Sequence, residues 1–311
     1  MRVAVIGGTG HIGSYLTPRL VEAGCETICV ARGQRAPYIP HPAWSEVARV
    51  TANRDEEHFA DRIAALKAEA VIDLTCYTLE SARKLVAALR GHTERLLHCG
   101  TIWVHGMSIE VPTTEDQPRR PISEYGARKA SIEAFLLNQT DVPATVLHPG
   151  HLVGEGWMPL NPAANFDPRV FSDLAEGRGI TLPNIGRETL HHVHADDVAQ
   201  CFVKALQNWP QAAGECFHVV SPAAVTMTGY AEAVAGWYGN EPQVRYLPWE
   251  EWRRSVSPKD ASVTWDHIAR SPNCSIAKAQ RLLGYAPRHR SPDAVRESLF
   301  SVLCPLRGLQ K

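Results

Sequence analysis

Three glycines near the start of the chain limit what it can fold into more than any other feature. Gly7, Gly10 and Gly13 directly follow the apolar run Val3–Ile6 at the spacing G-x-x-G-x-x-G, and a helical pattern begins within them. This spacing permits a tight turn and lets backbone N–H groups approach a pyrophosphate, which the positive end of the following helix also attracts. Random placement would produce the spacing about 0.1 times in a chain of this composition. The order strand, turn, helix favours a dinucleotide-binding loop over a structural turn, and its candidate residues are Gly7, Gly10, His11, Ile12 and Gly13.

Short β-branched runs alternate with helical patterns through the first half of the chain. The expected strands are Val3–Ile6, Thr27–Val30, Val47–Val50, Val71–Leu74, Leu96–Cys99 and Ala144–Leu147. The expected helices between them are Ile12–Ala23, Glu56–Lys67, Leu79–Leu89 and Glu124–Leu137. Such alternation is typical of a parallel sheet that is covered by helices on both faces. The sequence therefore predicts an α/β fold with a Rossmann-type doubly wound parallel sheet.

The pattern changes after about residue 150, where loops rich in Pro, Gly and Asn appear, such as Gly154–Asp167 and Leu182–Gly186. We expect a dinucleotide-binding domain over residues 1–150 and a smaller, irregular C-terminal substrate lobe over 151–186 and 221–311. Segments between 187 and 220, including Ala195–Gln207 and Cys216–Val220, are expected to return to the main sheet.

The segment after the second expected strand indicates which dinucleotide binds. NAD sites usually place an acidic residue there, on the ribose hydroxyls. This chain has Arg32 and Arg35 at that place and no carboxylate in the segment Cys29–Arg35. Arginine suits a 2′-phosphate, so we predict NADP in preference to NAD, although both side chains could instead be solvated surface charges. Asn53, after the third strand, is either an adenine ligand or a turn residue.

A tyrosine and a lysine four residues apart form the second motif. Tyr125 and Lys129 fall on one face of the expected helix Glu124–Leu137. An unperturbed phenol titrates near 10, and a neighbouring ammonium lowers that pKa, so the pair can move a proton at a hydroxyl or carbonyl oxygen. The spacing alone is weak and also fits a surface contact. Its position beyond the fifth strand, after a glycine loop, favours the catalytic interpretation.

With both motifs in this order, the chain resembles the extended short-chain dehydrogenases/reductases, in the NAD-dependent epimerase/dehydratase family. The resemblance is also carried by the stretches Leu97–Gly106, His148–Gly154 and Val193–Val198. It implies that Tyr125 is the general acid/base, that Lys129 tunes it and anchors the ribose, and that Thr101 hydrogen-bonds the reacting oxygen.

The stretch Val71–Tyr77, together with the Ala-Arg-Gly that follows the second strand, resembles a less studied subgroup of this family. It makes Thr75 a candidate cofactor residue. On the substrate side, His148, His151 and Leu190 replace residues that are usual in sugar-nucleotide epimerases, which weakens the case for a nucleotide-sugar substrate. The candidate substrate residues are Cys76, Trp103, His151, Arg187 and His191.

Composition excludes several classes of function. The net charge of −1 argues against nucleic acid and anionic membranes as partners, and no apolar run approaches the ~20 residues of a membrane span. The cysteines, at positions 25, 29, 76, 99, 201, 216, 274 and 304, include no Cys-x-x-Cys pair and are expected to be reduced thiols in a cytoplasmic protein. We predict no metal site, because the resemblance explains His194, Asp196 and Asp197 as a helix start with an aspartate as N-cap.

The leading hypothesis is an NADP-dependent oxidoreductase that moves hydride between the nicotinamide and a hydroxyl or carbonyl carbon of a small or sugar-like substrate. The alternatives are a sugar or sugar-nucleotide epimerase/dehydratase that retains NAD(P), and a non-catalytic dinucleotide-binding or regulatory protein. A homodimer is expected through the helices 79–89 and 124–137, where the family often packs a four-helix bundle.

Overall fold

The computed structural model describes residues 1–303, and Cys304 lies outside them. A central sheet of seven parallel strands has the order β11-β6-β5-β4-β1-β2-β3. Its strands are β1 (Arg2–Ile6), β2 (Glu26–Ala31), β3 (Ala48–Thr51), β4 (Ala70–Asp73), β5 (Arg95–Cys99), β6 (Ala144–Pro149) and β11 (Cys216–Val219). The six strands expected in the first half are all present, and Cys216–Val219 returns to the sheet beside β6, as predicted.

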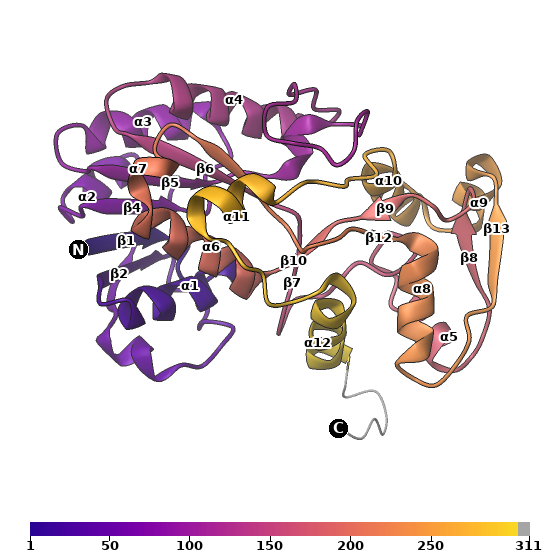
Figure 1. Ribbon diagram of the computed structural model, residues 1–311. Coiled ribbons are helices and arrows are strands. Elements are labelled where there is room, and N and C mark those ends of the chain that lie inside the picture. Colours follow the sequence, from indigo (N-terminus) through magenta and orange to yellow (C-terminus); the bar gives the residue numbers. More distant parts are fainter. Residues whose placement is uncertain (304–311) are drawn as a thin grey trace.

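Helices cover both faces of the sheet, which confirms the predicted doubly wound arrangement (Figure 1). On one face, Ile12, Leu16 and Leu20 of α1 share an apolar cluster with Phe202 and Leu206 of α6. On the other face, α2, α3 and α4 pack on a second cluster. These helices are α1 (His11–Glu22), α2 (Phe59–Ala64), α3 (Leu79–Leu89), α4 (Glu124–Asn138) and α6 (Ala195–Gln207).

Two local expectations need correction. α2 begins at Phe59 rather than Glu56, because the charged residues before it are exposed and form a turn with nothing to bury. The N-cap of α6 is His194 rather than an aspartate, since its side chain accepts a hydrogen bond from the Asp196 N–H. The Asp196 carboxylate is instead paired with Arg19 and Arg288.

The C-terminal part lies at the carboxyl ends of the strands and has an apolar core of its own, which includes Phe171, Tyr230 and Trp252 (Figure 1). Its small sheets pair β7 (His151–Val153) with β10 (His192–His194), β9 (Thr189–Leu190) with β12 (Val225–Thr226), and β8 (Ile180–Pro183) with β13 (Val244–Leu247). The helices of this part are α5 (Arg169–Ala175), α8 (Met227–Gly236), α9 (Trp249–Ser255), α10 (Pro258–Ile268) and α12 (Ser291–Leu303). Two further short helices, α7 (Trp209–Ala212) and α11 (Ala277–Leu283), pack beside the central sheet.

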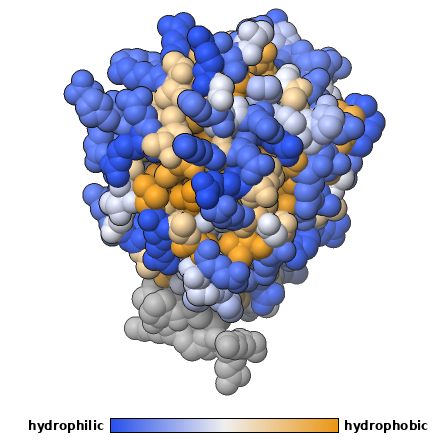
Figure 2. Space-filling model, turned by 90° about the vertical axis from the view of Figure 1, so that its left-hand side faces the viewer, coloured by the Kyte–Doolittle hydropathy of each residue, from blue (hydrophilic) through white to orange (hydrophobic). Residues whose placement is uncertain are grey.

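Figure 2 views the opposite edge, at the amino ends of the strands, where hydrophilic side chains surround a smaller group of hydrophobic ones. Within residues 1–303, no helix has the length and apolar character needed to cross a membrane. All described cysteines are free, and all except Cys25 are buried.

Candidate active site

A cleft of about 450 Å³ opens at the carboxyl ends of β1, β2 and β4. The carboxyl ends of these parallel strands share one edge of the sheet, and Ile6 of β1 pairs with both Val30 of β2 and Asp73 of β4. The cleft is lined by every predicted cofactor residue except Lys129, namely Gly7, Gly10, His11, Ile12, Gly13, Arg32, Arg35, Asn53 and Thr75. The predicted residues, which are up to 68 positions apart in the chain, therefore line one cavity of a size that suits a ligand.

The glycine loop needs glycine because its backbone packs closely. The Gly10 N–H donates to the Gly7 carbonyl oxygen at 2.9 Å. Gly7 has a φ of +87°, and a Cβ there would lie 2.6 Å from Cγ2 of Thr75. A Cβ on Gly13 would lie 2.5 Å from the carbonyl oxygens of both Gly7 and Gly8. This packing brings the amino end of α1 to the cleft, where its free N–H groups can hold a diphosphate.

Arg32 and Arg35 lie exposed at the rim of the cleft, after β2. The lining residues contributed by β2 and the segment after it include no carboxylate. Arg35 donates from Nη1 to the hydroxyl of Tyr38 at 2.6 Å. Asn53 lines the cleft and also accepts a bond from the Asp55 N–H at 3.4 Å, so it is a turn residue that faces the ligand site as well.

Arg54 is a lining residue that the sequence analysis missed. It forms an ion pair with Asp73 at the end of β4, and its Nη1 lies 2.7 Å from Oγ of Ser81. The same Asp73 oxygen accepts the Thr75 N–H at 3.1 Å, so this pair holds the segment that packs on Gly7. Two features of the sequence could have indicated this ion pair: the arginine directly after Asn53, and the acidic residue near the end of an expected strand.

Thr101, Tyr125 and Lys129 lie next to this cleft. Thr101 and Tyr125 share a side-chain hydrogen bond. Lys129 is buried, and its Nζ donates to the carbonyl oxygens of Cys76 and Cys99, each at 2.8 Å. The ammonium also lies 4.8 Å from the centre of the Tyr77 ring, and both Tyr77 and Thr75 line the cleft.

The prediction that Lys129 lowers the pKa of Tyr125 is wrong for this structure. Burial raises the pKa of the Tyr125 phenol, and the electrostatic effects of Cys99 and Tyr77 add to the rise. The hydrogen bond with Thr101 opposes the rise, but Lys129 is not among the causes. The physical reason is that the ammonium is bound to two backbone carbonyl oxygens, and the phenol remains a protonated acid.

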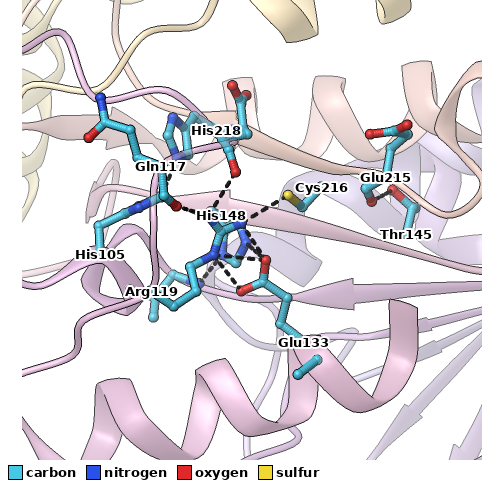
Figure 3. Close-up of polar contacts among 12 residues, drawn as sticks. His105, Gln117, Arg119, Glu133, Thr145, His148, Glu215, Cys216 and His218 are labelled. Atoms are coloured by element: carbon cyan, nitrogen blue, oxygen red, sulfur yellow. Dashed lines mark hydrogen bonds and ion pairs between the residues drawn. The ribbon is translucent and has the colours of Figure 1, made fainter. Parts of the chain in front are cut away.

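A largely buried polar network of His148, Glu133, Arg119 and Cys216 contacts the backbone of Thr101, and Figure 3 shows these four residues. The Thr101 N–H donates to Nδ1 of His148 at 3.0 Å, and Nε2 of His148 lies 3.3 Å from Glu133 on α4. Glu133 also pairs with Arg119, whose Nη2 lies 3.2 Å from the sulfur of Cys216. Glu133, His148 and Cys216 could together hold a metal ion by their spacing, but the Arg119 guanidinium already supplies the positive charge at this point.

The aromatic ring of Trp103 lies edge-on to Tyr125, with ring centres 6.0 Å apart. The guanidinium of Arg270 packs on the Trp103 ring, and its central carbon Cζ lies 3.9 Å from the ring centre. Arg270 is only 1% exposed, and its Nε and Nη2 have no hydrogen-bond partner among the residues described. This buried cation with two unused donors was not found from the sequence, where no motif distinguishes it from other arginines.

The other candidate substrate residues separate in the structure. The His151 ring lies 5.5 Å from that of His267, which in turn contacts Trp103 at 5.2 Å. Nε2 of His151 has no partner within residues 1–303. Arg187 is exposed between β8 and β9.

Two of the predicted substrate residues need correction. In His191, Nδ1 accepts the Cys274 N–H at 3.1 Å and Nε2 donates to the Ser221 carbonyl at 2.9 Å, so neither ring nitrogen is left for a ligand. Cys76 is 1% exposed, and burial raises the pKa of its thiol to about 11. Its carbonyl oxygen, rather than its sulfur, serves the site by binding Lys129.

Comparison with known proteins agrees with this arrangement. A sequence profile described as "NAD dependent epimerase/dehydratase family" matches residues 3–219. "Chloroplast stem-loop binding protein of 41 kDa b" of Arabidopsis thaliana is 25% identical, over 96% of this chain and 78% of its own length. "dTDP-6-deoxy-L-talose 4-dehydrogenase (NAD(P)(+))" of Kitasatospora kifunensis is 31% identical, over 50% of this chain and 54% of its own length.

The fold also matches solved structures. UDP-glucose 4-epimerase of Thermotoga maritima, solved with UDP-glucose, has a TM-score of 0.73 at 19% identity, covering 99% of this chain and 100% of that chain. At this identity the match demonstrates a shared fold. It includes both the large sheet and the irregular C-terminal part.

Proposed function

This chain belongs to the NAD-dependent epimerase/dehydratase family, and on that premise we propose that it is an NADP-dependent oxidoreductase. It would transfer hydride between the nicotinamide and a hydroxyl or carbonyl carbon of a small or sugar-like substrate. Enzymes of this family use NAD(P), and the bound nicotinamide supplies or accepts the hydride. The chain's own residues would bind the cofactor, orient the substrate and move the proton.

The cleft supports the proposed cofactor. The glycine loop and the amino end of α1 would hold the diphosphate, since the close packing at Gly7 and Gly13 brings the free N–H groups of this helix end to the cleft. Arg32 and Arg35 would bind the 2′-phosphate, for which a planar guanidinium is suited. Asn53 would bind the adenine, and Thr75 would line the ribose and nicotinamide side.

The proton would pass through the Tyr125 hydroxyl, with Thr101 hydrogen-bonding the same substrate oxygen. Burial raises the pKa of Tyr125, so the phenol carries the proton that reduction of a carbonyl requires. For Lys129 to anchor the ribose, its Nζ would have to leave at least one of the carbonyl oxygens of Cys76 and Cys99.

The substrate side favours a ligand with an anionic group. Trp103, His151 and Arg270 lie on the side of Tyr125 that faces the C-terminal part, and Arg270 has two donors to offer. Nη1 of Arg270 already lies 3.6 Å from the Asp266 carboxylate, and an acid or phosphate bound to the two remaining donors would stabilise this buried cation further. Trp103 covers the guanidinium, so binding would require this indole to shift.

One observation carries the proposal: Lys129 contacts the Cys76 carbonyl and the Tyr77 ring, and Tyr77 lines the same cleft as the glycine loop and the two arginines. Lys129, which lies one helical turn from the proposed proton donor Tyr125, therefore borders the proposed cofactor site. The test is a binding titration with NADPH, NADP, NADH and NAD, after the purified protein has been checked for retained nucleotide. NADPH should bind more tightly than NADH, and Arg32→Ala should remove most of the difference.

The second candidate is an epimerase or dehydratase that keeps its cofactor through each turnover. It is favoured by the shared fold of the UDP-glucose 4-epimerase structure. Tightly retained NAD without a phosphate preference, together with isomerisation of a sugar nucleotide and no lasting change in nicotinamide absorbance, would replace the leading proposal with this one. A non-catalytic role is disfavoured by the intact trio of Thr101, Tyr125 and Lys129.

Two further parts of the proposal concern the setting of the enzyme. A homodimer would form through α3 and α4, with no nucleic acid or membrane as partner. A cytoplasmic location is supported by the free, mostly buried thiols, which fit a reducing compartment.

A further inference from the structure

We infer that Trp157, which belongs to the C-terminal part of the chain, is a wall of the cofactor cleft and slows the release of bound dinucleotide. This inference rests on the proposed cofactor site. It adds a residue that no glycine-loop motif includes, and it makes cofactor exchange depend on contact between the sheet and the C-terminal part.

The first observation is a stack between Trp157 and the glycine loop. The rings of Trp157 and His11 are 4.6 Å apart with an angle of 5° between their planes, and both residues line the cleft. His11 is the first residue of α1 and is 5% exposed. Both of its ring nitrogens are buried and have no hydrogen-bond partner in the described part of the chain, so the imidazole serves here as a packed ring.

The second observation connects Trp157 to the proposed 2′-phosphate site. Tyr38 lies edge-on to Trp157 at 6.0 Å and to His11 at 5.7 Å. Its hydroxyl accepts from Arg35, and its backbone N–H donates to Oγ of Ser14 on α1 at 2.9 Å. The three rings therefore form one aromatic cluster between the glycine loop and the segment that carries Arg35, and His11 and Trp157 are its members that line the cleft.

The third observation is that Trp157 is fixed from its own side by α12. Ser298 donates its hydroxyl to the Trp157 carbonyl oxygen, and Oγ of Ser301 accepts the Gly156 N–H at 2.8 Å. Gly156 has a φ of +75°, and a Cβ there would lie 2.8 Å from the Tyr38 ring. The turn is held tightly enough to keep the indole over His11.

These contacts have a kinetic consequence. A dinucleotide that runs from the glycine loop to Arg35 passes along the wall of His11 and Trp157, which Tyr38 supports by its ring contacts. For it to leave past this wall, the indole has to separate from His11. The loss of one aromatic stack costs enough free energy to change a dissociation rate measurably. Variants of one complex also differ mostly in their dissociation rates rather than their association rates.

The experiment measures NADPH release from the full-length protein by stopped flow, with excess NADP as competitor. Tryptophan fluorescence reports binding, because the dihydronicotinamide absorbs where tryptophan emits. We expect Trp157→Leu to raise the dissociation rate about tenfold, and Trp157→Phe, which keeps an aromatic ring, to change it by less than about threefold. Trp265→Leu is the matched control, since Trp265 lies in the same part of the chain, is 46% exposed and does not line the cleft.

Equal dissociation rates for the wild type and Trp157→Leu would overturn the inference. So would an equal increase in Trp157→Leu and Trp265→Leu, because that would indicate a general loosening of the C-terminal part. Thermal unfolding of each variant checks that it is folded, and Trp157→Phe keeps the test valid if the leucine variant is not. Failure of the wild type to bind either NADPH or NADH would instead count against the proposed function.

Discussion

The backbone N–H of Thr101 lies 3.0 Å from Nδ1 of His148, at the end of a buried network that begins at Arg119. A Cβ on Gly100 would lie 2.4 Å from the same nitrogen, so the imidazole packs flat beneath the chain that leads into Thr101. His148 therefore holds the backbone of a residue to which we assign a hydrogen bond with the substrate.

The contribution of this bond can be measured by comparing His148→Leu with His148→Asn. The two replacements have the same number of side-chain non-hydrogen atoms and the same branching, but only asparagine offers an oxygen near the position of Nδ1. Leaving the buried Thr101 N–H without an acceptor should make the leucine variant less stable than the asparagine variant by about 1–2 kcal/mol. Denaturant unfolding gives the two free energies, and equal values would mean that the bond adds nothing.

The Glu133 carboxylate makes stability depend on acid pH. Burial disfavours its charge, but His148 and Arg119 outweigh this effect and hold the pKa of Glu133 well below its ordinary value of 4.5. The unfolded chain then binds the proton at a higher pH than the folded one, so this stabilisation is present above pH 4.5 and is lost as the pH falls below it.

Glu133→Gln should therefore flatten the acid side of the stability curve. At neutral pH the variant should be less stable by about 3 kcal/mol, because Arg119 loses its buried partner. The difference from the wild type should shrink as the pH is lowered toward 3. Unfolding curves collected across this pH range provide the measurement. If the wild type and the variant lost stability in parallel as the pH fell, Glu133 would not be the source of the acid dependence.

Tyr125→Phe removes only the hydroxyl that we assign to proton transfer. We expect turnover to fall by about 10²- to 10⁴-fold, while the dissociation constant for NADPH changes by less than about twofold. Steady-state kinetics on the substrate found by carbonyl screening, together with a binding titration, separate the two effects. A matching loss of NADPH binding would show that the residue belongs to the cofactor site instead.

Gly13→Ala tests whether the glycine loop needs its close packing. The added Cβ would lie 2.5 Å from two backbone carbonyl oxygens, so either the loop or α1 must shift. We expect at least a tenfold loss of NADPH affinity, since the amino end of α1 moves away from the diphosphate. Gly236→Ala is the control, because a Cβ there meets nothing within 4 Å, and it should bind NADPH as the wild type does.

The homodimer is tested by sedimentation equilibrium. The chain has a mass of 34.3 kDa, and we expect a species of twice this mass. Exposed residues on α3 and α4 include Arg83, Ala87, Ala127 and Ala134, so Ala134→Glu should shift the equilibrium toward the monomer. A single species at 34.3 kDa for the wild type would remove the dimer from the proposal.

The sequence by itself determined the features whose causes are local. The glycine spacing predicted a loop that only glycine can form, and the bounds of Leu79–Leu89 were matched by α3 because its apolar periodicity and its Thr78 cap lie within one segment. The spacing of Tyr125 and Lys129 placed them on one helix, since four residues make about one turn. The alternation of strands and helices predicted the layers, because each element has to bury one face.

Only the tertiary structure decided which partners these residues meet. Lys129 binds the carbonyl oxygens of Cys76 and Cys99 rather than Tyr125. Both ring nitrogens of His191 hydrogen-bond to the backbone, one at Ser221 and the other at Cys274. Arg270 reaches Trp103 from 167 residues away in the chain, a distance given by their numbering. Burial depends on how separate segments pack, and burial sets both the pKa of a phenol and the cost of guanidinium donors that have no hydrogen-bond partner. No periodicity or motif spacing carries that information, because the atoms that exclude water from a side chain come from elsewhere in the sequence.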